Sequence, residues 1–230
     1  MLLMGLQKLT LLDFPGKLAC TVFTGGCDFR CPFCHNASLV RLNAESARLP
    51  EEEFFKFLNT RKGVLQGVCI TGGEPTLQPD LEQFIIKSRD LGFKVKLDTN
   101  GNNPEVLKKL VAQGLVDYVA MDIKNSLENY GETIGIEQFD ISKVLQSINF
   151  LLGNPVDYEF RTTLVKQFHS TNDILSIGNL IKGAKHYYLQ GFIDSGDLLG
   201  DNLEGFTKEE TENLVNLLKP YVDSVEIRGF

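Results

Sequence analysis

The sequence lacks three features that would place it in a familiar class. No apolar run approaches the roughly 20 residues that a membrane-spanning helix needs. The opening Met1-Leu2-Leu3-Met4 is broken at once by Gly5, so it is no signal-peptide core. Basic residues are not in excess either, since the 230-residue chain carries a formal charge of −7. Because binding to nucleic acid needs a basic surface, these absences argue against membrane and nucleic-acid partners and predict a cytoplasmic protein.

Internal repeats, low-complexity tracts and linkers are also absent. We therefore expect one domain over residues 1–230, with an N-terminal segment at 1–16 and a barrel at 17–230. Runs rich in Val, Ile, Tyr, Phe and Thr alternate with stretches whose apolar residues recur three and four positions apart. This alternation predicts an α/β protein with a parallel sheet. The expected strands are 18–24, 67–71, 94–98, 118–123, 158–165, 186–192 and 224–227, and the helical stripes include Phe54, Phe84, Leu107, Ile148 and Leu214.

Polar and glycine-rich residues gather just after successive strands. Gly25-Gly26-Cys27, Gly72-Gly73-Glu74-Pro75 and Asp98-Thr99-Asn100-Gly101 each follow a strand-like run. Loops at the C-terminal ends of many strands build the site of a β/α barrel, whereas an open sheet gathers its site at one switch point. The pattern therefore favours a barrel, which six or seven strands would leave incomplete. An open sheet remains possible, because a sequence does not show closure.

Three of the five cysteines lie close together. A chain of this length needs no disulfide or structural metal to fold, and in a reducing compartment clustered cysteines indicate metal binding or catalysis. Cys27, Cys31 and Cys34 can converge on one metal centre. Because a cuboidal iron–sulfur cluster takes one cysteine per iron, three cysteines leave one iron open, as a catalytic site requires.

The alternative is a zinc site of three cysteines and one histidine, in a zinc-stabilised protein without catalytic activity. His35 is a poor fourth ligand because it directly follows the last cysteine, but His169 or His186 could serve. The other two cysteines, Cys20 and Cys69, lie within strand-like runs, where a free cysteine packs as a small apolar side chain. We expect these two to contribute to packing alone.

The CxxxCxxC spacing, with the aromatic Phe33 before its last cysteine, resembles the radical S-adenosylmethionine (radical SAM) superfamily. Gly72-Gly73-Glu74-Pro75 after the second core strand strengthens the likeness. The resemblance implies a partial (β/α)6 barrel of the TIM type over essentially the whole chain. It also implies a [4Fe–4S] cluster held by Cys27, Cys31 and Cys34, with S-adenosylmethionine (SAM) chelating the open iron. Reductive cleavage of SAM would yield methionine and a 5′-deoxyadenosyl radical that abstracts a hydrogen atom.

In this family the turns after the strands hold SAM, although each of these sequences is also an ordinary turn former. By resemblance, Gly73 and its neighbours meet the SAM ammonium and Glu74 shapes the turn. Arg161 is a candidate for the SAM carboxylate, because a charged residue in an apolar strand is seldom unpaired. Lys124 is another candidate, or a surface lysine. The expected cofactor-binding set is Phe33, Gly72, Gly73, Glu74, Pro75, Asp98, Thr99, Asn100, Lys124 and Arg161.

Two further segments resemble enzymes that activate glycyl-radical enzymes by taking hydrogen from a backbone glycine. Asp13-Phe14-Pro15-Gly16 could be a simple turn before a strand, but it is similar to their Asp-Gly-Pro-Gly motif, with Phe14 as a departure. The likeness implies that Asp13, Pro15 and Gly16 bind the partner, with Asp13 near the barrel mouth. Residues 10–36 and the terminal Glu226-Ile227-Arg228-Gly229-Phe230 are most similar to activating proteins of anaerobic ribonucleoside-triphosphate reductase.

The resemblance thus implies an oxidoreductase of anaerobic metabolism, with that reductase as partner and reduced flavodoxin or ferredoxin as electron donor. No auxiliary cluster is expected, because the chain has no ferredoxin-like cysteine insert. Two alternatives remain within the superfamily. One is a pyruvate formate-lyase activating enzyme, and the other is an enzyme acting on a small molecule, such as a 7-carboxy-7-deazaguanine synthase.

Overall fold

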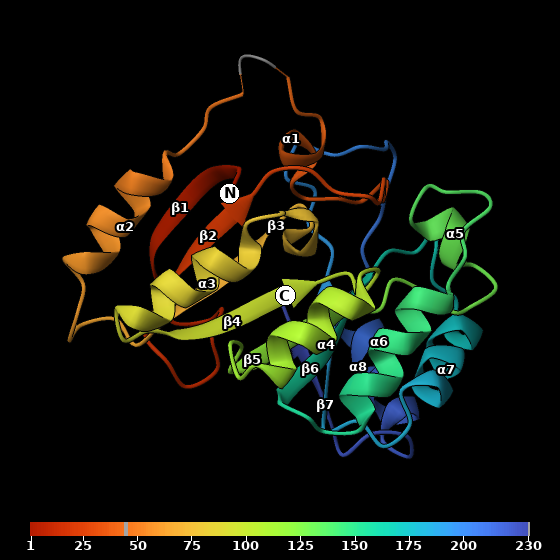
Figure 1. The fold of residues 1–230 in the computed structure, drawn as a ribbon. Helices are drawn as coiled ribbons and strands as arrows, with labels where there is room; N and C mark the ends of the chain where they lie inside the picture. Colours follow the sequence, from red (N-terminus) through yellow and green to blue (C-terminus); the bar gives the residue numbers. More distant parts are fainter. Residues whose placement is uncertain (44–45, 230) are drawn as a thin grey trace.

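A computed structural model describes residues 1–43 and 46–229; Phe230, which closes the terminal segment singled out above, lies outside them. Eight strands form one curved sheet in the order in which they occur in the chain (Figure 1). β1 is antiparallel to β2, and all other neighbours are parallel. The strands are β1 (Leu3–Thr10), β2 (Ala19–Thr24), β3 (Gly67–Gly72), β4 (Lys94–Thr99), β5 (Tyr118–Asp122), β6 (Asp157–Leu164), β7 (His186–Gly191) and β8 (Ser224–Arg228).

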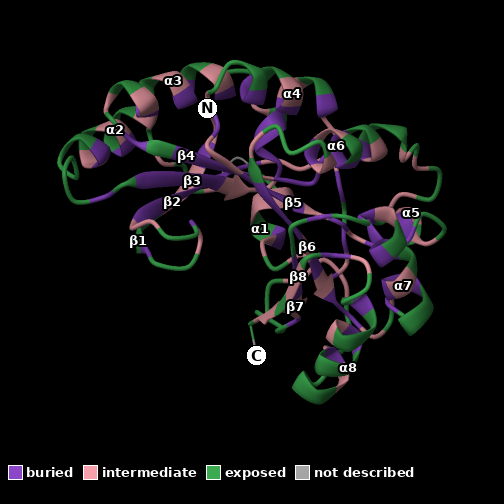
Figure 2. Ribbon diagram, turned by 90° about the horizontal axis from the view of Figure 1, so that it is seen from below, coloured by how far each residue is buried: buried purple, intermediate pink, exposed green. Residues whose placement is uncertain are grey.

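The helices form an outer layer that turns its buried residues toward the sheet (Figure 2). At least one helix follows each strand from β2 to β7, which gives six successive βα units. No helix in the described ranges is long and apolar enough to cross a bilayer. The helices are α1 (Ala37–Val40), α2 (Glu51–Asn59), α3 (Leu81–Asp90), α4 (Pro104–Ala112), α5 (Tyr130–Thr133), α6 (Ser142–Leu152), α7 (Thr171–Leu180) and α8 (Lys208–Leu218), with a short 3₁₀ helix at Pro75–Leu77.

The predicted α/β class is confirmed, and each of the seven predicted strands is present to within one residue at either end. Among the described residues β8 pairs only with β7 and β1 only with β2, so the barrel is incomplete, as expected. Two elements were not foreseen. β1 contains a single β-branched residue, Thr10, and a glycine. α7 begins at a capping box of Ser170 and Asp173, a spacing that the sequence does display.

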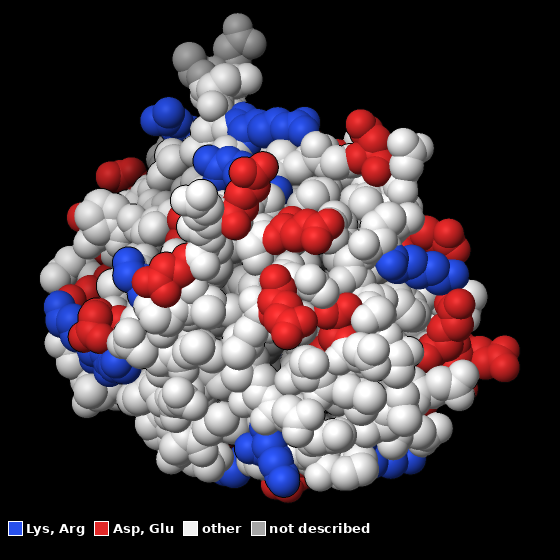
Figure 3. Space-filling model, turned by 90° about the vertical axis from the view of Figure 1, so that its right-hand side faces the viewer, with Lys and Arg blue, Asp and Glu red and all other residues white. Residues whose placement is uncertain are grey.

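The two faces of the sheet have opposite character. On β4, Val95 and Leu97 belong to the apolar core between sheet and helices, so alternation turns Lys96 and Asp98 toward the barrel interior. Lys96 is only 1% exposed. The interior of this barrel is therefore polar and charged, whereas the interior of a closed (β/α)8 barrel is filled by branched apolar side chains. On the outer surface, the face in Figure 3 carries more acidic than basic side chains, in line with the net charge.

One buried carboxylate joins the edge strand β8 to the middle of the sheet. Glu159 of β6 is fully buried and accepts hydrogen bonds from both Nη atoms of Arg228 on β8, at 2.8 and 3.0 Å. It also accepts one from the Tyr118 hydroxyl of β5 at 3.0 Å. The Arg228 guanidinium lies 3.3 Å above the ring of Tyr188 on the intervening strand β7, which adds a cation–π contact. Four strands are thus connected at this point.

We predict that Glu159→Gln lowers the free energy of unfolding by about 2 kcal/mol, because the amide faces a guanidinium with one of its own donors and breaks a partly buried, charge-assisted pair. The measurement is urea denaturation followed by circular dichroism. Glu226→Gln on β8 is the matched control, since that side chain is exposed and bonds only to Ser224. Equal stability of the two variants would contradict the proposed connection.

Candidate active site

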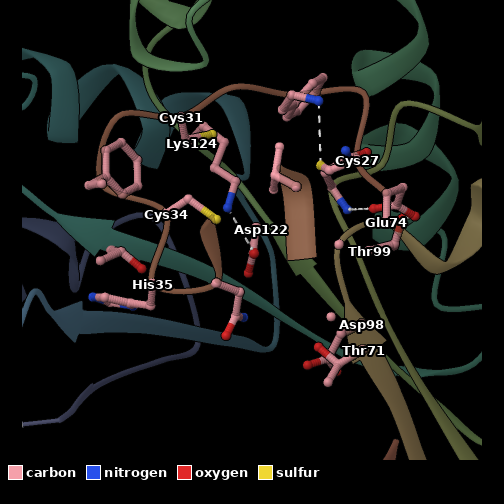
Figure 4. Close-up of a pocket in the computed structure, with 18 of the residues that line it drawn as sticks. Cys27, Cys31, Cys34, His35, Thr71, Glu74, Asp98, Thr99, Asp122 and Lys124 are labelled. Atoms are coloured by element: carbon pink, nitrogen blue, oxygen red, sulfur yellow. Dashed lines mark hydrogen bonds and ion pairs between the residues drawn. The ribbon is translucent and has the colours of Figure 1, made fainter. Parts of the chain in front are cut away.

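A cavity of about 270 Å³ lies where the loops that follow the parallel strands meet (Figure 4). Side chains from the ends of β3 to β7 and from the loop after β2 line it. Of the residues predicted to bind metal or cofactor, it brings together Cys27, Cys31, Phe33, Cys34, Gly72, Gly73, Glu74, Asp98, Thr99, Asn100, Lys124 and Arg161. Pro75 is buried beside this set, at the start of the 3₁₀ helix, and does not line the cavity.

The three clustered cysteines sit on one loop whose sulfur atoms face the cavity (Figure 4). Main-chain hydrogen bonds fix the loop at both ends: Arg30 donates to Ile134 O, and Gly200 donates to Pro32 O, each at 2.8 Å. Burial raises the pKa of Cys27 to about 12 and that of Cys31 to about 11. A metal that binds here must therefore displace thiol protons, as metal–thiolate sites do.

The histidines do not complete a zinc site. His35 stacks on Phe192 with ring centroids 5.4 Å apart. Both ring nitrogens of His169 lie within hydrogen-bond distance of main-chain atoms of Val165 and Lys124, and His186 is at the opposite end of β7. Within residues 1–43 and 46–229, no three His, Cys, Asp or Glu side chains are placed to hold a single ion. Three cysteines spread along a cavity wall fit a cluster with one cysteine per iron.

The glycines after β3 allow the second loop to approach the cysteine loop. A Cβ on Gly73 would lie 2.0 Å from Gly26 O, so no other residue fits there without a backbone shift. Gly72 has φ +118°, in the region that favours glycine. The next residue, Glu74, donates its main-chain N–H to Gly26 O at 2.8 Å. The pair of glycines thus serves close packing of two loops.

Glu74 links the turn after β3 to the turn after β4. Its buried carboxylate accepts hydrogen bonds from Thr76 N at 3.0 Å, Thr99 Oγ1 at 2.8 Å and Asn100 N at 2.7 Å. Burial raises the pKa of this carboxyl to about 7 against the opposing effect of these donors. Asn100 continues the connection, because its side-chain amide donates to Asp28 of the cysteine loop at 2.7 Å. The role of shaping the turn, expected for Glu74, agrees with these contacts.

A chain of ion pairs crosses the cavity floor. Arg161 donates from Nε to Asp122 at 2.8 Å and from Nη1 to Asp98 at 3.0 Å. Lys124 pairs with Asp122 at 2.9 Å, and Lys96 pairs with Asp98. Burial alone would raise the pKa of both carboxyls, but Arg161 and the two ammonium groups outweigh it and hold both pKa values below the usual range. Arg161 is thus engaged by two aspartates of the protein.

Sequence reasoning left several residues of the site unassigned. Lys96 was missed, although its place two residues before Asp98 puts both on one face of a strand. Asp28 was also missed; it accepts amide hydrogens from Asn100 and Asn102, each at 2.7 Å. Further cavity-lining side chains that had no role in the sequence analysis are Asn36, Thr71, Thr163 and Gln190.

The segment with Asp13, Pro15 and Gly16 lies at the other end of the barrel. It forms the turn between β1 and β2, before the N-terminal end of β2, whereas the cysteine loop follows the C-terminal end (Figure 1). Asp13 accepts a hydrogen bond from Thr21. Phe14 is buried at the barrel base against Ala19, Cys69 and Tyr118. The expectation that Asp13 lies near the mouth is therefore wrong, because in a parallel sheet the turn before a strand and the loop after it lie on opposite sides.

Comparison with known proteins gives a consistent assignment. The family model described as the Radical SAM superfamily matches residues 21–167. A protein of Methanocaldococcus jannaschii named "Putative glycyl-radical enzyme activating enzyme" is 33% identical over 233 residues, which covers 99% of this chain and 95% of that protein. The pyruvate formate-lyase-activating enzyme of Clostridium pasteurianum is 29% identical over 224 residues, with 91% and 86% covered.

Solved structures agree on the fold. Streptococcus suis SuiB bound to S-adenosylmethionine superposes with a TM-score of 0.70 at 15% identity, over 88% of this chain and 48% of SuiB. This chain thus spans about half the length of SuiB. A domain of pyruvate-formate lyase-activating enzyme from Bacteroides vulgatus gives a TM-score of 0.58 at 15% identity, over 71% of this chain and 99% of that domain.

We predict that Cys27→Ala, Cys31→Ala and Cys34→Ala each lose the visible absorbance of an iron–sulfur cluster after anaerobic reconstitution, because each removes the ligand of one iron. Cys20→Ala and Cys69→Ala are the matched controls, since both cysteines are fully buried within strands, and they should retain iron and colour. Equal loss in all five variants, by iron analysis and absorbance, would mean that the ligand assignment is wrong.

Proposed function

The chain belongs to the radical SAM superfamily, and from this premise we propose that it activates a glycyl-radical enzyme, anaerobic ribonucleoside-triphosphate reductase, by taking a hydrogen atom from a backbone glycine. Enzymes of the superfamily use a [4Fe–4S] cluster and SAM. The observation that carries the proposal is the match to the Methanocaldococcus jannaschii protein over nearly the full length of both chains. The likeness of residues 10–36 to activating proteins of that reductase supports the choice of partner.

The residues of the cavity would divide the work of holding both cofactors. Cys27, Cys31 and Cys34 would hold the cluster, which together with SAM supplies the reductive cleavage that generates the hydrogen-abstracting radical. The main-chain carbonyls near Gly73 would accept from the SAM ammonium, since no side chain obstructs them. Lys124 donates to Asp122 through one hydrogen, so its ammonium keeps two further donors for the SAM carboxylate.

The remaining predicted residues would act mainly by position. Thr99 is bonded to Glu74, and Arg161 holds Asp98 and Asp122 ionised. A charged floor of this kind suits a ligand that carries an ammonium, a carboxylate and a sulfonium. Phe33 is 4% exposed and packs against Phe168, with ring centroids 5.7 Å apart; it would form part of the apolar wall for the adenine.

Two features favour a protein substrate that reacts at a single cluster. The sheet is not closed between β1 and β8 in the described residues, so a loop of a large partner could approach through the side as well as the top. The two cysteines outside the cluster loop, Cys20 and Cys69, are fully buried in strands, which agrees with the absence of an auxiliary cluster. Reduced flavodoxin or ferredoxin would supply the electron.

We predict that anaerobic mixing of the reduced, reconstituted protein with SAM and the reductase produces a stable glycyl radical, observed as a doublet by electron paramagnetic resonance. The signal should depend on SAM and reach a sizeable fraction of one spin per reductase chain. Cys31→Ala should abolish it, because this variant lacks a cluster ligand.

Replacing the reductase by pyruvate formate-lyase tests the choice of partner. A doublet that forms only on pyruvate formate-lyase would retain the activating role and reject the partner. SAM cleavage with no radical on either protein would reject the activating role and favour a small-molecule substrate.

A further inference from the structure

A short helix after β5 is built against the cysteine loop. α5 lies beside the loop (Figure 1), and Arg30 N donates to Ile134 O just after the helix, at 2.8 Å. Gly135, with φ +71°, follows at once, and a Cβ there would lie 2.6 Å from Arg30 O. The close backbone contact fixes the first residue of the helix, Tyr130, relative to the loop.

The ring of Tyr130 is held by aromatic contacts on two sides. It stacks on Phe139 at a centroid distance of 5.7 Å and an interplanar angle of 13°. Phe29, which lies between Cys27 and Cys31 in the loop, meets it edge-on at 6.4 Å and 78°. Tyr130 is 1% exposed. The ring therefore has one position, and its hydroxyl has one place to lie.

The hydroxyl of Tyr130 is buried without a hydrogen-bond partner, one of three such side-chain atoms among the described residues. A buried hydroxyl that donates to nothing is costly, so its retention needs a reason. Lys124, Cys31 and Asp122 are near enough to influence its pKa, which burial raises well above the usual range.

These three neighbours are not equivalent as acceptors for the hydroxyl. Lys124 is a donor, and Asp122 already accepts from Lys124 and Arg161. The sulfur of Cys31 is the neighbour with no partner of this kind, and a thiolate that ligates iron accepts hydrogen bonds. We propose that Tyr130 donates a hydrogen bond to the Cys31 sulfur when the [4Fe–4S] cluster is bound, and so makes the cluster easier to reduce.

The physical effect follows from charge. Reduction adds an electron to the cluster, and a donor aimed at a ligand sulfur stabilises the more negative state, which raises the reduction potential. Tyr130 would thus act through Cys31 as a positioning residue. The proposal rests on the cluster, which the superfamily uses, and not on which partner protein is activated.

The test compares Tyr130→Phe with Tyr158→Phe. The first keeps the ring and its contacts and removes only the hydroxyl. The second is a matched control, because Tyr158 is also a buried tyrosine whose hydroxyl has no partner, but it lies at the start of β6, away from the cavity. Both proteins are reconstituted anaerobically, and the midpoint potential of the cluster is measured by titration without SAM or partner.

We expect Tyr130→Phe to shift the midpoint to a more negative value by about tenfold in the ratio of oxidised to reduced cluster, or about 59 mV for one electron. The electron–nuclear double resonance spectrum of the reduced cluster should lose a coupling to an exchangeable proton. Tyr158→Phe should match the unsubstituted protein in both measurements.

An unchanged midpoint and an unchanged proton coupling in Tyr130→Phe would overturn the proposal, as would equal shifts in the two variants. A failure of the unsubstituted protein to take up any cluster would instead overturn the proposed function itself. The two failures are therefore distinguishable, since the first is read only from a protein that holds its cluster.

Discussion

The inner face of the sheet is charged, and the ion pairs of β4, β5 and β6 make that possible. A charge removed from water is tolerated only when it is paired and hydrogen-bonded. Here Asp98 and Asp122 are each shared between two cations, with Arg161 common to both and Lys96 and Lys124 at the ends. The register of the strands depends on these pairs, because a slip of one residue would turn every one of these charges into the apolar layer under the helices.

The loops above this floor are drawn together by main-chain proximity. Gly73 approaches Gly26 so closely that the turns after β2 and β3 pack backbone to backbone, and Glu74 extends the contact to the turn after β4. The cavity is therefore bounded by loops that fix one another. Charged residues lie below it and thiols lie at its wall, an arrangement that matches the polar and metal-binding halves of the superfamily's two cofactors.

Most of the fold and of the site could be predicted from the sequence, because local patterns carry both. Period-two strands and period-three-to-four helices are visible in any window, and the cysteine spacing is local. The misplacement of Asp13 has a different origin: a likeness in sequence does not state which end of a strand a segment occupies. Likewise, the pairing of Arg161 with two aspartates depends on three strands that are distant in the sequence. Lys96 was accessible to alternation, but nothing local distinguishes a buried lysine from an exposed one.

The hydrogen bonds that hold the cysteine loop have a consequence for the lifetime of the enzyme. In a zinc finger the metal supplies the folding energy, so loss of metal is loss of structure. In this chain Arg30, Pro32 and Asp28 are each tied to a different part of the barrel by contacts that involve no metal. Exposure to oxygen that destroys the cluster would thus leave a folded scaffold with its thiols in place. Such a scaffold can be repaired by inserting new iron and sulfide, without unfolding and resynthesis.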